Sequence, residues 1–112
     1  MGTTVVLPEI EKEVTTGDES EDQHEPLYHV ILLDDNDHTY EYVVEMLTKI
    51  FGFSEERAYE YTVSVDTHGH TRLVTCALSE AEKKRDQVHS YGADWRLERS
   101  TGSMAALVEP AQ

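Results

Sequence analysis

The chain has 112 residues, a formal net charge of -14 and a single cysteine, Cys76. This length favours one domain with a modest core. The acidity argues against binding to nucleic acids and to anionic membranes, because both attract basic proteins. One cysteine allows no intramolecular disulfide and no paired-cysteine metal site, which is typical of a reducing compartment. The sequence predicts no signal peptide and no membrane span, so we expect a cytoplasmic protein. We also expect it to be a monomer.

Residues 1–26 are predicted to form an acidic, flexible tail that precedes a folded domain at 27–112. Positions 9–25 hold eight acidic residues against one lysine, which is half of the net charge. Such a segment buries too little apolar surface to offset the entropy lost on ordering. Two interpretations stay open: a solvated leader, or an acidic arm that engages a partner.

The first predicted strand covers residues 28–33 and is largely apolar, so we expect it in the centre of its sheet. Four polar residues at 34–37 end this strand, and a helix is predicted over 39–50. Asp37 or Thr39 is suited to cap this helix, and Gly52 to end it.

A second helix is predicted from Ser54, its N-cap, to about Ser64. Gly69 then indicates a tight turn before a strand at 71–78, which is rich in β-forming residues. Cys76 lies in this strand, and we interpret it as a small buried hydrophobic residue rather than a nucleophile.

A third helix is predicted from Ser79 to about Tyr91, with Gly92 ending it. Ser79 and Glu82 have the spacing of a capping box. Residues 83–85 form a basic cluster, which is either a solvated face or a docking patch.

A final strand is predicted at 103–108, after a connector or short strand at 96–100. The resulting order of elements is β-α-α-β-α-β. This order favours a small α+β domain in which three helices cover a three-stranded, mainly antiparallel sheet.

The sequence contains no phosphate loop, dinucleotide fingerprint or nucleophile elbow, so we expect no enzyme activity and no cofactor. Residues 35–41 resemble a calcium loop only faintly, because the central glycine and the distant glutamate are missing. The alternating Asp and His residues at 66–70 are more typical of a polar surface turn than of a zinc site.

The acidic turn after the first strand is the strongest candidate for a binding site. Its carboxylates lie next to the apolar face of the following helix, and Asp66 arrives from the end of the second helix. Carboxylates bind ammonium groups through charge-assisted hydrogen bonds. An apolar cavity beside them is predicted to be lined by Tyr40, Val43, Met46, Thr62 and Val65. The alternative is that the acidic residues only cap the helix and favour its positive end.

The stretches YHVILLDDNDHTYEYVVEML, at 28–47, and ERAYEYTVSVDTHGHT, at 56–71, resemble the ClpS family of Clp protease adaptors. The resemblance extends from Tyr28 to about Pro110. It implies three antiparallel strands and three helices, similar to the C-terminal domain of the ribosomal stalk protein. It also implies a non-enzymatic adaptor that binds N-degron residues and delivers substrates to a ClpA- or ClpC-like AAA+ unfoldase.

The resemblance implies that Asp34, Asp35 and Asp66 bind the substrate's α-amino group, with Asp66 at the position of a family histidine. The implied pocket lining is Asn36, His38, Tyr40, Val43, Met46, Thr62 and Val65. Tyr40 takes the place of a methionine that excludes β-branched side chains. Because three carboxylates around one ammonium repel each other, we expect at least one raised carboxyl pKa, or pairing with His38 or His68.

The third helix is the implied docking surface for the unfoldase. Lys84 matches a basic position of the family and Glu82 an acidic one, while Ser79 replaces the acid at the helix start. An alternative function is a divergent interaction module that docks on the unfoldase and regulates it without recognising N-degrons.

Overall fold

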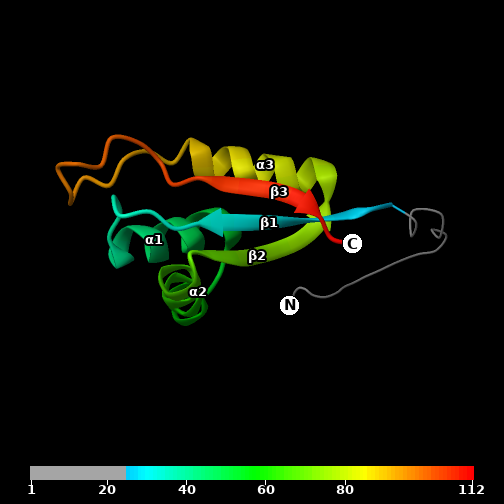
Figure 1. Ribbon diagram of the computed structural model, residues 1–112, viewed down its shortest axis with the longest axis horizontal. Coiled ribbons are helices and arrows are strands. Elements are labelled where there is room, and N and C mark those ends of the chain that lie inside the picture. Colours follow the sequence, from blue (N-terminus) through cyan, green and yellow to red (C-terminus); the bar gives the residue numbers. More distant parts are fainter. Residues whose placement is uncertain (1–24) are drawn as a thin grey trace.

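The computed structural model describes residues 25–112 of the chain (Figure 1). The predicted acidic tail therefore lies outside the described residues, except for Glu25 and Pro26. The described elements follow the order β1-α1-α2-β2-α3-β3 and form a three-stranded sheet with three helices. This confirms the predicted α+β fold.

The central strand of the sheet is β1 (Leu27–Leu33), as its apolar sequence predicted. It pairs antiparallel with β2 (His70–Ala77) on one side and with β3 (Ala106–Pro110) on the other. Val30 and Leu32 are fully buried and belong to the hydrophobic core, so the sheet anchors the domain through its middle strand.

The strand β3 begins later than the predicted range of 103–108. Ser103 lies before the strand, and its hydroxyl accepts a hydrogen bond from the backbone N–H of Gly92 at 2.7 Å. Residues 90–105 form a loop between α3 and β3, here called the 90–105 loop. No strand forms at 96–100, where the backbone makes turns.

The helix α1 (Tyr40–Phe51) is bounded by the residues that the sequence indicated. The Thr39 side chain accepts a hydrogen bond from the N–H of Tyr42 and so acts as the N-cap. Gly52 ends the helix with a φ of 72°, a left-handed conformation that glycine adopts without steric cost.

The helix α2 (Glu55–His68) starts after its predicted cap, Ser54, but extends beyond the predicted end at Ser64. The additional turn keeps Val65 buried in the core, and Gly69 ends the helix with a φ of 85°. As a result, Asp66 lies within the last turn of a helix rather than in a loop.

The helix α3 (Leu78–His89) corrects the capping prediction, because its N-cap is Ala77 and no side chain caps it. Ser79 therefore lies inside the helix and the predicted capping box is wrong. The reason is that β2 ends at Ala77 and the helix follows at once, without a loop residue that could act as a cap. The helix ends before Ser90, so Gly92 belongs to the following loop.

The helices pack together and against the sheet. α3 contacts all three strands, α2 contacts β2, and α1 lies against both α2 and α3. α3 runs beside β3, whereas α1 and α2 gather at the end of the sheet where β1 runs into α1 (Figure 1). Among residues 25–112, no helix is long and apolar enough to cross a membrane.

Candidate functional site

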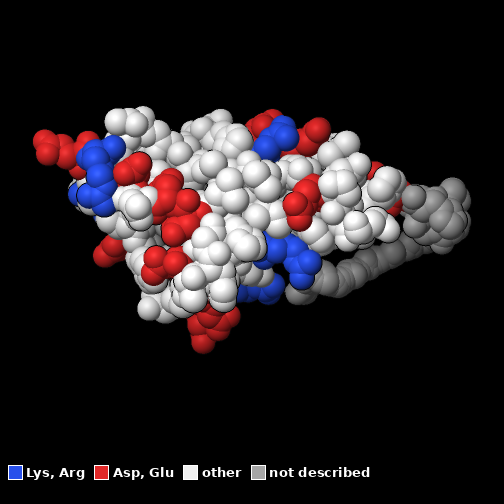
Figure 2. All heavy atoms as spheres, viewed as in Figure 1, with Lys and Arg blue, Asp and Glu red and all other residues white. Residues whose placement is uncertain are grey.

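The structure brings the three predicted carboxylates to the edge of one cavity of about 340 Å³. The cavity is lined by Asp34, Asp35, Asn36, His38, Tyr40, Val43, Thr62, Val65, Asp66, Arg99 and Met104. We call Asp34, Asp35 and Asp66 the acidic rim. Acidic side chains lie over the region where β1 ends and α1 begins, with basic side chains beside them (Figure 2).

Met46 is the predicted lining residue that the structure does not place at the cavity. It is fully buried in the hydrophobic core. Met46 lies about one helical turn beyond Val43, away from the acidic rim. Met104, from the 90–105 loop, lines the cavity instead.

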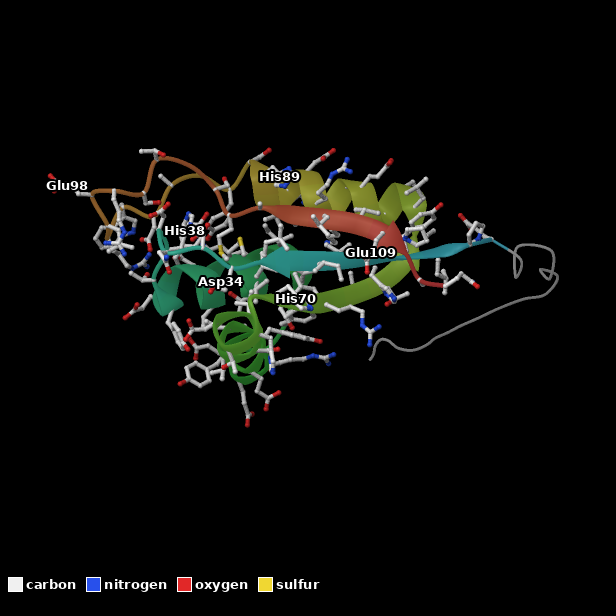
Figure 3. The ribbon with its side chains drawn as sticks, viewed as in Figure 1. Asp34, His38, His70, His89, Glu98 and Glu109 are labelled. Atoms are coloured by element: carbon white, nitrogen blue, oxygen red, sulfur yellow. The ribbon has the colours of Figure 1, made fainter. Side chains whose placement is uncertain are left out.

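A backbone hydrogen bond brings the two parts of the acidic rim together. The N–H of Asp34 donates to the carbonyl oxygen of Gly69 at 2.9 Å. Because Gly69 follows the last turn of α2, this contact joins the end of β1 to the helix turn that carries Asp66. Asp34 and His70 lie at this same end of the sheet (Figure 3).

The cavity has an apolar floor beneath the acidic rim, formed by Val43, Thr62, Val65 and Met104. All four residues are buried. The Thr62 hydroxyl donates to the carbonyl oxygen of Ala58 at 2.8 Å, so the polar part of this side chain is satisfied within α2. The floor is therefore suited to an apolar group.

The acidic rim has the electrostatic features expected of crowded carboxylates. Burial raises the pKa of Asp34; a backbone hydrogen bond from Asp35 lowers it, and the charges of Asp66 and Asp35 raise it further. Asp35 is paired with His38, whose Nδ1 lies 2.7 Å from Asp35 Oδ1. The pairing with His38 was expected from the sequence. A raised carboxyl pKa was expected too, but its largest cause at Asp34 is burial rather than the repulsion between carboxylates.

Tyr40 connects α1 to Asp66 on α2. Its hydroxyl donates to Asp66 Oδ2 at 2.7 Å. This hydrogen bond, together with burial and the charge of Asp66, raises the pKa of Tyr40 to about 12. Tyr59 packs edge-on against Tyr40, with 5.9 Å between ring centroids. Asp66 is thus already bound through one oxygen.

Two residues that the sequence did not indicate hold the acidic turn in place. The Arg99 guanidinium donates to the backbone oxygen of Asn36 and lies 3.3 Å from the Asp37 carboxylate. Asp94, which is fully buried, accepts hydrogen bonds from the N–H and the hydroxyl of Thr39 at 2.7 and 2.8 Å. Both residues are more than 50 positions away from their partners, so no local pattern could reveal them.

The environment of Asp94 keeps it charged. Burial raises the pKa of Asp94, but hydrogen bonds from Thr39 and Arg96 outweigh this effect and lower it to about 2. The buried carboxylate therefore acts as a fixed anchor between the 90–105 loop and the start of α1.

The two predicted docking residues on α3 have different environments. Lys84 donates to the carbonyl oxygen of Ile50 at 2.8 Å, and its ammonium lies 5.6 Å from the centre of the Phe51 ring. Its charge thus supports the C-terminal end of α1. Glu82 lies on the exposed side of α3, in a shallow depression that Lys83 also lines.

The remaining chemical candidates are not part of the cavity. Cys76 is partly buried, and burial raises the pKa of its thiol to about 11. His68 Nδ1 lies 3.1 Å from the carbonyl oxygen of Ser64 on its own helix. Within residues 25–112, no group of three His, Cys, Asp or Glu side chains is placed to hold a metal ion.

Comparison with known proteins identifies the family of this chain. The family model "ATP-dependent Clp protease adaptor protein ClpS" matches residues 23–95. The chain belongs to the ClpS family. The ClpS adapter of Nautilia profundicola is 33% identical over 64 residues, covering 57% of this chain and 66% of that protein. The ClpS adapter of Methylococcus capsulatus is 36% identical over 66 residues, covering 59% and 62%.

The ClpS fold is also found by comparison of structures. The solved structure of Agrobacterium tumefaciens ClpS2 bound to L-phenylalaninamide matches with a TM-score of 0.68 and 24% identity. The match covers 78% of this chain and 99% of that chain. The aligned segments span slightly less than two thirds of the two curated ClpS relatives, at 66% and 62% of their lengths.

Proposed function

We propose that this chain is a non-enzymatic adaptor that binds the N-terminal residue of substrate proteins and delivers them to a ClpA- or ClpC-like AAA+ unfoldase. The observation that carries this proposal is the cavity itself, in which an acidic rim surrounds an apolar floor. The rim binds the free α-amino group and the floor receives the side chain of the same residue. A volume of about 340 Å³ lies at the lower end of the range of about 300–1,000 Å³ usual for small-ligand sites.

The ligand of the structural relative supports this assignment of chemistry. L-phenylalaninamide, bound in Agrobacterium tumefaciens ClpS2, carries a free α-amino group next to an aromatic side chain. Its amide group corresponds to the first peptide bond of a substrate. A carboxylate rim above an apolar floor is complementary to both features of such a ligand.

Tyr40 is expected to restrict which side chains enter the cavity. Its ring lines the cavity and is held by hydrogen bonding to Asp66 and by packing against Tyr59. A fixed aromatic ring at this position leaves less room near the Cβ atom of a bound residue. We therefore expect N-terminal Leu, Phe, Tyr and Trp to bind, and Val and Ile to be excluded.

Peptide binding measured by fluorescence anisotropy tests the proposal. Peptides that begin with Phe or Leu are expected to bind, and acetylation of the amino group is expected to abolish binding. Asp34→Asn should weaken binding, because it removes a charge from the rim. Glu41→Gln, which changes an exposed acid outside the cavity, is the matched control. Failure of every peptide with a free amino terminus to bind would exclude the recognition role.

A second candidate function is an interaction module that docks on the unfoldase without recognising N-degrons. It is favoured by the Tyr40–Asp66 hydrogen bond, which occupies one of the three rim carboxylates before any ligand arrives. Co-purification of an unfoldase by the wild-type chain, lost in Glu82→Ala and accompanied by no peptide binding, would support this alternative.

A further inference from the structure

The His38 side chain is buried between two hydrogen-bond acceptors. Its Nδ1 lies 2.7 Å from Asp35 Oδ1, and its Nε2 lies 2.7 Å from the carbonyl oxygen of Gly102. Only 3% of this side chain is exposed, against 33% of the Asp35 side chain, so water has little access to the ring nitrogens. His38 lies beyond the end of β1, at the same end of the molecule as Asp34 (Figure 3).

These two contacts require an additional proton. A carbonyl oxygen has no proton to donate, and Asp35 Oδ1 already accepts a hydrogen bond from the N–H of Asp37 at 3.0 Å. A neutral imidazole donates through one nitrogen only, whereas an imidazolium donates through both. Both hydrogen bonds therefore exist together when the ring is an imidazolium facing a carboxylate. Loss of the second proton breaks one of them.

The two acceptors belong to segments of the chain that are far apart in the sequence. Asp35 is part of the acidic rim, whereas Gly102 lies in the 90–105 loop, between the cavity-lining residues Arg99 and Met104. His38 and Gly102 are 64 positions apart in the sequence, so the ring forms a long-range link. This link fixes the orientation of the Asp35 carboxylate relative to the loop that closes the cavity.

We propose that doubly protonated His38 is a positioning residue that ties the 90–105 loop to the acidic rim and makes ligand binding dependent on pH. The inference rests on the proposed function, since the ligand is a peptide with a free α-amino group. When the ring loses its second proton, either Asp35 or the loop is released. The affinity for the amino terminus then falls, while the fold remains intact.

Other charged and titratable groups lie near His38, but they ordinarily titrate in other pH ranges than histidine does. Asp35 contacts the ring directly, and the Tyr42 ring packs against it with 4.5 Å between centroids. The other groups at the cavity and its flanks are Asp34, Asp37, Tyr40, Asp66, Asp94 and Arg99. Among these side-chain types, only histidine ordinarily titrates between about pH 5 and 8.

NMR of the histidine ring nitrogens, recorded against pH on the full chain without ligand, tests the link directly. Both nitrogens of His38 are expected to carry protons at acidic pH, and loss of one should shift the backbone amide signals near Gly102. Affinity for a Phe-initiated peptide should decrease about tenfold over the pH interval in which the ring loses its second proton, because one hydrogen bond of a charged pair is lost.

A pair of variants provides the matched comparison. His38→Gln keeps an N–H donor for Gly102 and leaves its amide oxygen, which only accepts, toward Asp35. Its affinity should therefore be reduced, and should lack the decrease that the wild type shows beyond the titration of the peptide's own amino group. His29→Gln alters a histidine whose Nδ1 contacts Thr75 within the sheet, and it should retain the wild-type pH profile. Circular dichroism melting establishes that both variants are folded.

Two results would overturn the inference: a His38 ring with one proton at every pH at which the two contacts persist, or a wild-type pH profile in His38→Gln. The ring and loop signals need no ligand. If His38 carries two protons and contacts both acceptors but no peptide binds, the result counts against the proposed function and leaves the link between rim and loop standing.

Discussion

Tyr40 and Asp66 form a hydrogen bond of 2.7 Å that joins the first turn of α1 to the last turn of α2. Both residues line the same cavity, so the bond crosses the site at which we place the substrate's amino group. A ligand ammonium must therefore share Asp66 with the tyrosine hydroxyl. This competition makes the tyrosine a direct probe of the site.

Tyr40→Phe is expected to increase the affinity for peptides with a free amino terminus several-fold. The substitution keeps the ring and removes the hydroxyl, which leaves both oxygens of Asp66 for the ligand. Anisotropy titrations measure the change, and Tyr59→Phe is the control because its ring only packs against Tyr40. Weaker binding by Tyr40→Phe would show that the hydroxyl itself contacts the ligand.

The same hydrogen bond predicts the alkaline behaviour of the unliganded protein. The pKa of Tyr40 is raised from 10.0 to about 12, so the bond stabilises the fold fully below pH 10 and is lost as the pH rises through about 12. Ultraviolet absorbance should detect a tyrosine that ionises near pH 12, and this transition should be absent from Tyr40→Phe.

Asp94→Asn is expected to lower the free energy of unfolding by about 2 kcal/mol at neutral pH. The folded-state pKa of about 2 lies below the usual 3.8, so the contribution is present above pH 3.8 and is lost as the pH falls through about 2. Urea denaturation at several pH values measures this. Asp86→Asn, at an exposed acid on α3, should have little effect. Equal losses in both variants would contradict the anchoring role of Asp94.

Lys84→Met is expected to destabilise the fold by about 1–2 kcal/mol, because the variant lacks the ammonium that binds the Ile50 carbonyl oxygen at the end of α1. Lys83→Met, on the neighbouring exposed position, should leave the melting temperature nearly unchanged. Comparing the two variants separates an effect on the stability of the fold from an effect on docking to the unfoldase. If unfoldase binding is lost in Lys83→Met at full stability, the exposed face of α3 is the docking surface. If both variants melt alike, Lys84 does not support α1.

The local features of the fold were predictable because they arise from neighbouring residues. Thr39 and Ser54 cap their helices by accepting hydrogen bonds from N–H groups three positions ahead. Gly52 and Gly69 end the same helices because both adopt left-handed conformations. The capping box at Ser79 failed for an equally local reason, since β2 leads into α3 without an intervening loop.

The sequence by itself determined the order of the elements, the central strand and the acidic residues that face the cavity, because composition and short-range spacing encode these features. Only the tertiary structure decided how the site is closed. Arg99, Asp94 and Gly102 reach the acidic turn from 55 to 64 positions away. Their contacts depend on the path of the 90–105 loop across the end of the sheet, and no periodicity in the chain specifies that path.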